Sequence, residues 1–195
     1  MGKIMATFYD AIMYPLEQHK FKKIRASLLK QAHGHVLEIG AGTGINFSFY
    51  SSEVTKVDAI EPDFSMRKKA KKKATTKIKL HDAQAESLPF EDNTFDSAVS
   101  TLVLCSVSDP ELAIQELKRV VKPNGKCLIF EHVKVENPII SKVQDVLTPV
   151  WKHMADGCHL NRETDILIEE ANFYVVKKHT HYQQIFRVLE VINQK

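Results

Sequence analysis

The chain has 195 residues, of which 44% are hydrophobic and 26% charged, and its formal net charge is +3 at pH 7. These values are typical of one globular domain and exclude a disordered, collagen-like or coiled-coil chain. The positive excess is too small to indicate nucleic-acid binding by itself. Three scattered cysteines, Cys105, Cys127 and Cys158, form no C-x-x-C pair, so we expect no metal site and no disulfide framework.

The first 33 residues have helical periodicity, interrupted at Pro15, which predicts two helical pieces. The aromatic residues of the first piece, Phe8, Tyr9 and Tyr14, either close over a ligand as a lid or pack the piece onto the core. No signal peptide and no apolar run of about 20 residues is visible. Together with the cysteine usage, this predicts a cytoplasmic protein.

Residues 34–135 alternate between strand and helix patterns. The expected strands cover residues 35–40, 56–61, 77–80, 95–100 and 126–133, with a turn at 123–125. Asp63 is expected to cap a helix that runs through Ala74, and Asp109-Pro110 begins a helix to about Val121. This alternation predicts a Rossmann-like, doubly wound α/β sheet that is mostly parallel and has helices on both faces.

Residues 136–195 show a different pattern. A helix is expected over 138–154 and a short helix capped near Asn161 or Thr164. Two strand-like runs, 173–179 and 184–191, flank a turn at His181. Such a terminal hairpin predicts an antiparallel edge strand at the C-terminus. The chain is therefore expected to be one domain in three parts: helical residues 1–33, a core over 34–135, and helices with a hairpin over 136–195.

A glycine-rich loop follows the first expected strand, with the sequence Glu38-Ile39-Gly40-Ala41-Gly42-Thr43-Gly44. Glycines let the backbone turn sharply and approach a ligand closely. The spacing is G-x-G-x-G, whereas dinucleotide enzymes use G-x-G-x-x-G, which disfavours an NAD-dependent oxidoreductase. Glu61 ends the second strand, where an acidic side chain can accept hydrogen bonds from ribose hydroxyls. These features favour a cofactor that contains adenosine.

The stretch from Ala85 to Asp96 reads AESLPFEDNTFD. With the glycine loop and Glu61, it resembles class I S-adenosylmethionine-dependent methyltransferases with a methyltransferase type 11 domain. The resemblance implies S-adenosylmethionine as cofactor and S-adenosylhomocysteine as product, with residues 34–135 as the cofactor-binding core. The helical residues 1–33 are predicted to form a lid over it. It implies cofactor contacts for Glu38, Gly40, Ala41, Gly42, Gly44, Asn46, Glu61, Pro62, Met66, Ala83, Gln84, Ala85, Thr101, Leu102 and Cys105. Gln84 stands where many members have Asp or Ser.

The segment from Trp151 to Thr164 matches W-x-x-x-x-D-G-C-x-L-x-R-E, which resembles the thiol S-methyltransferases of the methyltransferase-like family. The resemblance implies a small-molecule acceptor, a thiol before an amine, and places it beside residues 136–195. A thiol reacts as its thiolate, so a neighbouring base would assist. The candidates are His132, His153, Asp156 and His159, of which we predict Asp156 and His159. The alternative is that these residues only cap turns or pack.

The sequence is also compatible with three alternatives: a phospholipid or amine N-methyltransferase, an RNA methyltransferase, and a non-catalytic protein that binds S-adenosylmethionine. The run from Arg67 to Lys73 holds six positive charges. It is interpreted as a solvated helix face, with contact between Lys68–Lys73 and an anionic membrane surface as the alternative. No aromatic residue interrupts the run for base stacking, so we expect no nucleic-acid partner.

Overall fold

The computed structural model describes residues 20–155 and 157–195. The first expected helical piece, with Phe8, Tyr9 and Tyr14, lies outside the described residues, as does Asp156. The lid prediction for the first residues therefore stays a prediction.

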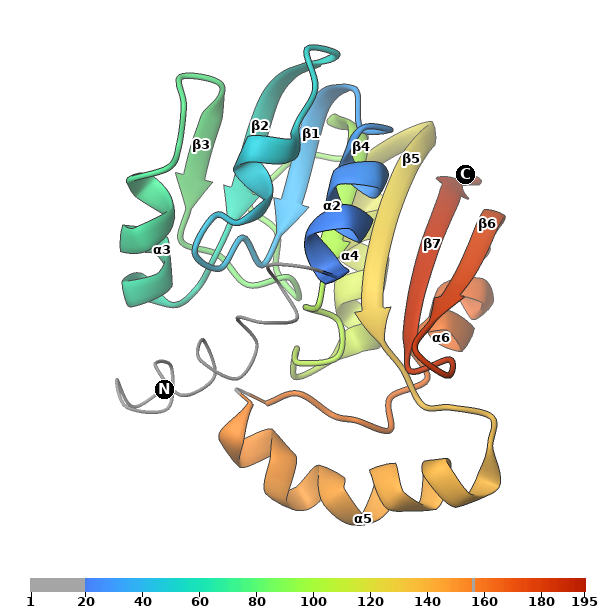
Figure 1. Cartoon of the computed structure of the whole chain (residues 1–195). Helices are drawn as coiled ribbons and strands as arrows, with labels where there is room; N and C mark the ends of the chain where they lie inside the picture. Colours follow the sequence, from blue (N-terminus) through green and yellow to red (C-terminus); the bar gives the residue numbers. More distant parts are fainter. Residues whose placement is uncertain (1–19, 156) are drawn as a thin grey trace.

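The described chain contains a seven-stranded sheet with the order β3-β2-β1-β4-β5-β7-β6 (Figure 1). The strands are β1 (Gly34–Ile39), β2 (Val54–Ile60), β3 (Ile78–His81), β4 (Phe95–Thr101), β5 (Val121–His132), β6 (Phe173–His181) and β7 (Phe186–Asn193). Strands β1 to β5 pair in parallel, and β7 is antiparallel to both of its neighbours, β5 and β6. The predicted Rossmann-like sheet with antiparallel pairing at its C-terminal edge is confirmed.

Helices cover both faces of this sheet. They are α2 (Lys22–Leu29), α3 (Phe64–Lys71), α4 (Pro110–Val120), α6 (Thr164–Glu170) and the short 3-10 helix η2 (Asn46–Phe49). Helix α5 (Pro138–Met154) lies instead beyond the carboxyl ends of the parallel strands (Figure 1). One buried cluster joins the sheet to α4 and α6, and a second joins the other face to α2, η2 and α3. The expected caps form, since Asp63 and Asp109 each accept a hydrogen bond from the backbone N–H three residues further on. No helix of the described chain is long and apolar enough to span a membrane.

Some expected boundaries were wrong. The glycine loop leads into η2, a short helix for which the sequence analysis gave no bounds, and Gly44 lies against the ring of Phe47. The helix expected to reach Ala74 ends at Lys71, where turn hydrogen bonds take over. The expected turn at 123–125 lies inside β5. Phe95 pairs with Val121 but Ser97 pairs with Lys126, so residues 122–125 bulge out of the strand.

The start of α6 and the position of the hairpin turn also differ from the predicted ones. Helix α6 begins at Thr164 after Glu163, so Asn161 does not cap it. His181 is the last residue of β6, and the turn follows over 182–185. Tyr182, Gln183 and Gln184 all have positive φ angles there, which a sequence without glycine does not signal.

The second N-terminal helical piece packs onto the sheet. Phe21 is fully buried, and its ring centroid lies 5.1 Å from that of Phe130 and 4.9 Å from that of Phe186, both edge-on. Leu28 and Leu29 join the same buried cluster. Helix α2 therefore fixes one face of the sheet, whose carboxyl edge carries the site described next.

Candidate cofactor and acceptor site

A cavity of about 340 Å³ opens at the carboxyl edge of the sheet, between β1 and β4, where the order of parallel strands reverses. Ligands of open α/β sheets bind at such a switch point. Eight residues predicted to contact the cofactor line the cavity: Gly40, Gly42, Glu61, Pro62, Met66, Gln84, Ala85 and Leu102. Residues not predicted also line it: Ile60, Glu86, Val103, Ser106, Val107, Ser108 and Ala155.

Gly40 and Gly42 of the loop differ in what surrounds the position of a Cβ atom. Both have positive φ angles, 62° at Gly40 and 55° at Gly42. A Cβ at Gly40 would overlap the side chain of Val103, so close packing requires glycine. A Cβ at Gly42 would have no protein atom within 4 Å. The space beside Gly42 is therefore open to a ligand in the cavity.

The carboxylate of Glu61 joins the second strand to the glycine loop. Its Oε2 accepts a hydrogen bond of 2.8 Å from the backbone N–H of Gly42, and its Oε1 accepts one of 2.9 Å from Asp63. Each carboxylate oxygen can accept a further hydrogen bond. Because Glu61 also lines the cavity, its carboxylate lies within reach of a ligand bound there.

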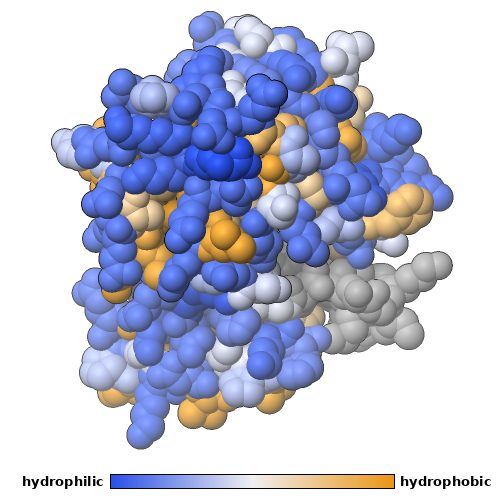
Figure 2. Space-filling view, turned by 180° about the vertical axis from the view of Figure 1, so that it is seen from behind, coloured by the Kyte–Doolittle hydropathy of each residue, from blue (hydrophilic) through white to orange (hydrophobic). Residues whose placement is uncertain are grey.

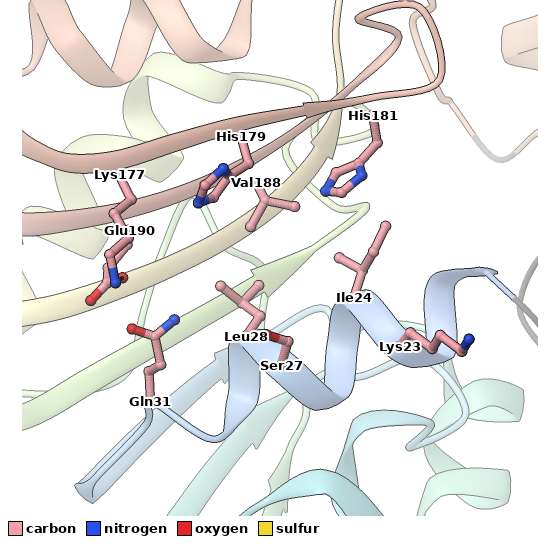
Figure 3. Close-up of a pocket in the computed structure, with 10 residues that line it drawn as sticks. All are labelled: Lys23, Ile24, Ser27, Leu28, Gln31, Lys177, His179, His181, Val188 and Glu190. Atoms are coloured by element: carbon pink, nitrogen blue, oxygen red, sulfur yellow. Dashed lines mark ion pairs between the residues drawn. The ribbon is translucent and has the colours of Figure 1, made fainter.

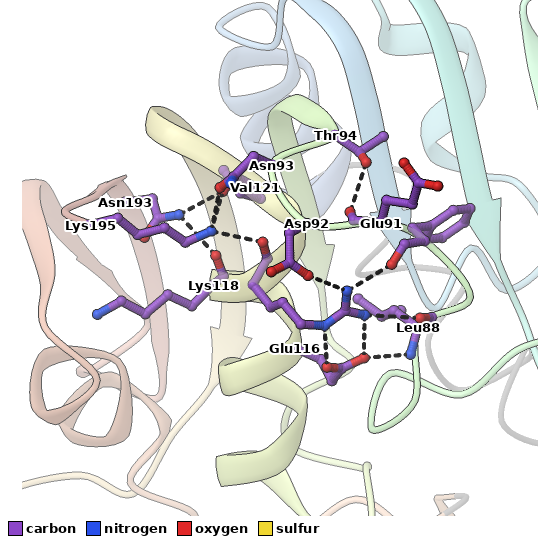
Figure 4. A network of polar contacts seen from close by, with 12 residues as sticks. Leu88, Glu91, Asp92, Asn93, Thr94, Glu116, Lys118, Val121, Asn193 and Lys195 are labelled. Atoms are coloured by element: carbon purple, nitrogen blue, oxygen red, sulfur yellow. Dashed lines mark hydrogen bonds and ion pairs between the residues drawn. The ribbon is translucent and has the colours of Figure 1, made fainter.

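The stretch that begins Ala85-Glu86 is bound to α4 by Arg119, which was not predicted. Figure 4 shows Leu88, Asp92 and Glu116 of this network. The guanidinium donates to the backbone oxygens of Leu88 (3.0 Å) and Phe90 (2.7 Å) and to the carboxylate of Asp92 (2.8 Å). Glu116 completes the arrangement: it accepts hydrogen bonds from Arg119 and from the N–H of Leu88. These contacts account for the Asp at the end of the L-P-F-x-D pattern and fix the backbone of Leu88 and Phe90, which follow Gln84 and Ala85 in the chain.

Behind the glycine loop lies a buried polar network. Glu38 accepts hydrogen bonds from Asn46 Nδ2 (3.0 Å) and from the hydroxyl of Tyr50 (2.7 Å). Asn46 also donates to Thr101 Oγ1 (2.9 Å) and accepts from Arg25 (3.0 Å). Burial raises the pKa of Glu38 to about 7, although its hydrogen-bond donors lower it. Glu38, Asn46 and Thr101, all predicted cofactor contacts, thus support the loop from behind and do not line the cavity.

Four other predicted contacts also lie outside the cavity lining: Ala41, Gly44, Ala83 and Cys105. Ala41 is buried, and its N–H bonds to the oxygen of Ile60. Gly44 has a φ of 73° and sits against the Phe47 ring. Cys105 is buried, as expected for a small hydrophobic residue.

Glu131, at the end of β5, orders the loop after β4. Its Oε1 accepts hydrogen bonds from Ser100 Oγ (2.9 Å), Val103 N (2.9 Å) and Leu104 N (3.0 Å). Leu102 takes a φ of 60° at this turn, which places it in the cavity wall. Burial raises the pKa of Glu131. Glu131 was not predicted as a site residue.

The segment after α5 packs on that same loop. Ala155 lines the cavity, and Gly157 has a φ of 84°, with Ser106 O only 3.0 Å from the position of a Cβ. The N–H of His159 donates to the oxygen of Cys105 (2.8 Å). Arg162 donates to the oxygens of Leu104 (2.7 Å) and Val107 (2.8 Å). Residues 157–162 therefore pack against the loop after β4 that forms part of the cavity wall, and Ala155 lines the cavity itself.

The three candidate histidines do not line the cavity. His159 has its Nδ1 3.4 Å from an Arg162 nitrogen. Burial lowers the pKa of His132 to about 4, so this imidazole is neutral, and its Nδ1 has no hydrogen-bond partner in the described part of the chain. His153 is exposed on α5, with its Nδ1 2.7 Å from the oxygen of Pro149. The base role of His159 and of Asp156 stays a prediction.

A second hollow, of about 410 Å³, lies between α2 and the β6–β7 hairpin. Figure 3 shows Ile24 and Leu28 of α2 facing Val188 of β7, with His179 and His181 at the rim. None of its lining residues comes from the loops at the carboxyl ends of β1 to β4, and none was predicted as a site residue. Among the residues described, no cluster of histidine, cysteine and acidic side chains could hold a metal ion.

Comparison with known proteins assigns the family. The methyltransferase domain family matches residues 37–129. Thiol S-methyltransferase TMT1B of Rattus norvegicus is 35% identical over 192 residues, which cover 89% of this chain and 78% of that protein. The chain belongs to this methyltransferase family. It is accordingly an S-adenosylmethionine-dependent methyltransferase.

Further relatives agree with this assignment. Human thiol S-methyltransferase TMT1A is 35% identical over 149 residues, 73% of this chain and 61% of that protein. The ubiquinone/menaquinone biosynthesis C-methyltransferase UbiE of Hahella chejuensis is 35% identical over 124 residues, 60% of this chain and 50% of that protein. The fold matches a Haloferax volcanii putative methyltransferase in complex with the activator Trm112. The TM-score is 0.77 at 13% identity, with 99% of this chain and 98% of that chain covered.

Proposed function

We propose that this methyltransferase transfers the methyl group of S-adenosylmethionine to the sulfur of a small thiol and releases S-adenosylhomocysteine. The observation that carries the proposal is the position of Ala155 and of residues 157–162. This segment carries the pattern typical of thiol S-methyltransferases, and it packs against the loop after β4 at the cavity. The similarity to thiol S-methyltransferase TMT1B over 89% of the chain supports the same acceptor class.

The residues present fit the cofactor. Glu61 would accept the ribose hydroxyls, the open space beside Gly42 would admit the adenosine, and Gln84 and Ala85 would lie beside the adenine. S-adenosylmethionine supplies an electrophilic methyl group on a sulfonium. The protein has to align the acceptor with that methyl group and exclude water. Apolar side chains of Leu102, Val103 and Val107 suit the second task and favour an apolar thiol.

The acceptor sulfur must lose its proton before it attacks. We propose His159, assisted by Asp156, as the group that takes it. His159 belongs to the segment that carries the thiol pattern and hydrogen-bonds through its backbone to Cys105 beside the cavity. Replacement by His159→Ala or Asp156→Asn should lower turnover at neutral pH and leave S-adenosylmethionine affinity intact. The defect should shrink as the pH approaches the pKa of the thiol, because thiolate then forms unaided.

An acceptor screen tests the proposed function. The full chain is incubated with S-adenosylmethionine and matched acceptors that differ only in a thiol, an amine or a hydroxyl, and S-adenosylhomocysteine release is measured. We expect the wild type to turn over the thiol. The Gly42→Val variant should be inactive with every acceptor. Turnover with the amine or a phospholipid, and none with the thiol, would contradict the acceptor assignment.

A further inference from the structure

Helix α5 carries its apolar side chains on its outward face. Ile139, Val146 and Val150 are 76%, 69% and 62% exposed. Val143, Leu147 and Met154 are also exposed and lie on the same side, because the spacing repeats every three or four residues. The space-filling view shows hydrophobic surface along the lower edge of the molecule, where α5 lies (Figure 2). A shallow apolar cavity of about 420 Å³ follows the first half of the helix.

The inward face of α5 has polar residues at its buried positions, with the half-buried Ile140 and Trp151 on the same side. Its buried residues are Gln144 and Thr148. Gln144 accepts from the N–H of Val135 (2.9 Å) and donates to the oxygens of Val133 (3.0 Å) and Leu160 (2.9 Å). The hydroxyl of Thr148 donates to the oxygen of Gln144 (2.7 Å). A surface helix ordinarily buries its apolar side. Here hydrogen bonds hold the helix by its polar side, so the apolar face is left for a partner.

The chemistry of the apolar face selects the partner. Its large side chains are aliphatic, whereas the core of a protein–protein interface is enriched in aromatic residues and arginine. The exposed Lys142 borders the face and Lys152 lies near the C-terminal end of the helix. The acidic group of the helix, Asp145, is engaged by Asn161 (2.8 Å) and Lys134 (3.4 Å). Aliphatic side chains bordered by lysine are typical of helices that lie in a membrane interface.

We propose that α5 lies flat on an anionic lipid surface, with the side chains of Ile139, Val146 and Val150 among the acyl chains. The lysines at 142 and 152 then meet the headgroups. Ala155 directly follows the helix and lines the cofactor cavity, so docking brings the cavity beside the lipid. Under the proposed function, this arrangement gives the enzyme access to apolar thiols dissolved in the membrane.

Vesicle flotation with the full chain tests the surface without requiring turnover. We expect the wild type to float with vesicles of phosphatidylcholine and phosphatidylserine and to be released as salt rises. The triple variant Ile139→Ser, Val146→Ser, Val150→Ser should lose at least tenfold in bound fraction. A matched control, Leu112→Ser, Ile166→Ser, Val176→Ser, removes exposed apolar side chains from α4, α6 and β6 and should bind like the wild type. Thermal shift with S-adenosylmethionine checks that each variant is folded.

Three results would overturn the proposal. The wild type could fail to bind vesicles, or the α5 variant could bind as well as the wild type. Sedimentation could show a wild-type dimer that the α5 variant converts to monomer, with no vesicle binding by either, which would make the face a contact between two copies. Failure of the acceptor assignment would leave flotation unchanged. The two proposals are therefore tested separately.

Discussion

The Sγ atoms of Cys105 and Cys158 lie 3.6 Å apart, although the residues are 53 positions apart in the sequence. Cys105 follows β4 and is buried, and Cys158 follows α5 and is half-buried. Their hydrogen bond raises the pKa of Cys105, which burial raises further, and lowers the pKa of Cys158. The pair marks the place where the acceptor-side segment meets the loop at the cavity.

This pairing predicts which cysteine reacts first with an alkylating agent. Cys158 should react fastest at pH 7.5 because it is the most accessible and has the lowest pKa of the three. Burial raises the pKa of Cys127 to about 12, so it should stay unmodified in the folded protein. In a Cys105→Ala variant, the Cys158 thiolate loses its donor and alkylation should slow, whereas Cys127→Ala should change nothing. Peptide mass spectrometry over time measures all three sites, and faster labelling of Cys105 than of Cys158 would refute this order.

Glu61 and Gly42 should control cofactor affinity. In Glu61→Gln the charged acceptor is lost, which costs about 1.5–3 kcal/mol, or roughly a 10- to 150-fold weaker Kd for S-adenosylmethionine. Gly42→Val should abolish binding because a branched side chain at a φ of 55° is strained and fills the open space. Titration calorimetry measures both, with the exposed Glu53→Gln as matched control. Unchanged affinity in both site variants would remove the cavity as the cofactor site.

Glu38 should make stability depend on pH. Its pKa is raised by burial from 4.5 to about 7, so the folded state holds a proton that the unfolded state releases. Its contribution to the free energy of unfolding is fully present below pH 4.5 and is lost as the pH rises through 7. In Glu38→Gln this loss disappears. The difference in stability between wild type and variant should shift by roughly 2–3 kcal/mol between pH 5 and pH 8, in favour of the variant at high pH.

Urea unfolding at several pH values measures that difference. Comparison with the variant cancels the contributions of the other titrating groups. One of them is His132, whose lowered pKa makes stability rise with pH instead of fall. A difference that is constant from pH 5 to pH 8 would show that Glu38 is ionised in the folded state throughout this range.

The basic residues in and just after α3 fall into two groups with different contacts. Lys68, Lys71 and Lys72 are exposed, whereas Arg67 donates to the oxygens of Glu61 and Pro62 and to the carboxylate of Asp82. Reversal by Lys68→Glu, Lys71→Glu, Lys72→Glu should leave cofactor affinity within about twofold and lower stability by about 1 kcal/mol, through the helix dipole. Arg67→Met should weaken cofactor binding, because it releases the loop that carries Glu61. Calorimetry and thermal unfolding compare the two, and equal effects on affinity would contradict the division.

Local sequence patterns determined most of the fold and the class of cofactor. Short apolar runs predicted the strands, the first two of them ended by Gly40 and Pro62, and Asp63 and Asp109 marked helix starts, because capping and turn preferences act over a few residues. The glycine spacing and Glu61 identified an adenosine cofactor for the same reason. Each of these features lies within one loop and the strand before it.

Only the tertiary structure decided which predicted residues reach the cavity. Glu38, Asn46 and Thr101 turn away from it into a network with Arg25, and Glu131 and Arg119 hold the walls from distant strands and helices. Such roles depend on pairs 20 to 30 residues apart or more, which no local pattern specifies. Helix α5 shows the same limit most plainly. Its bounds, 138–154, follow from the sequence, but the hydrogen bonds of Gln144 to Val133 and Leu160 turn its apolar face outward, against the orientation that periodicity alone favours.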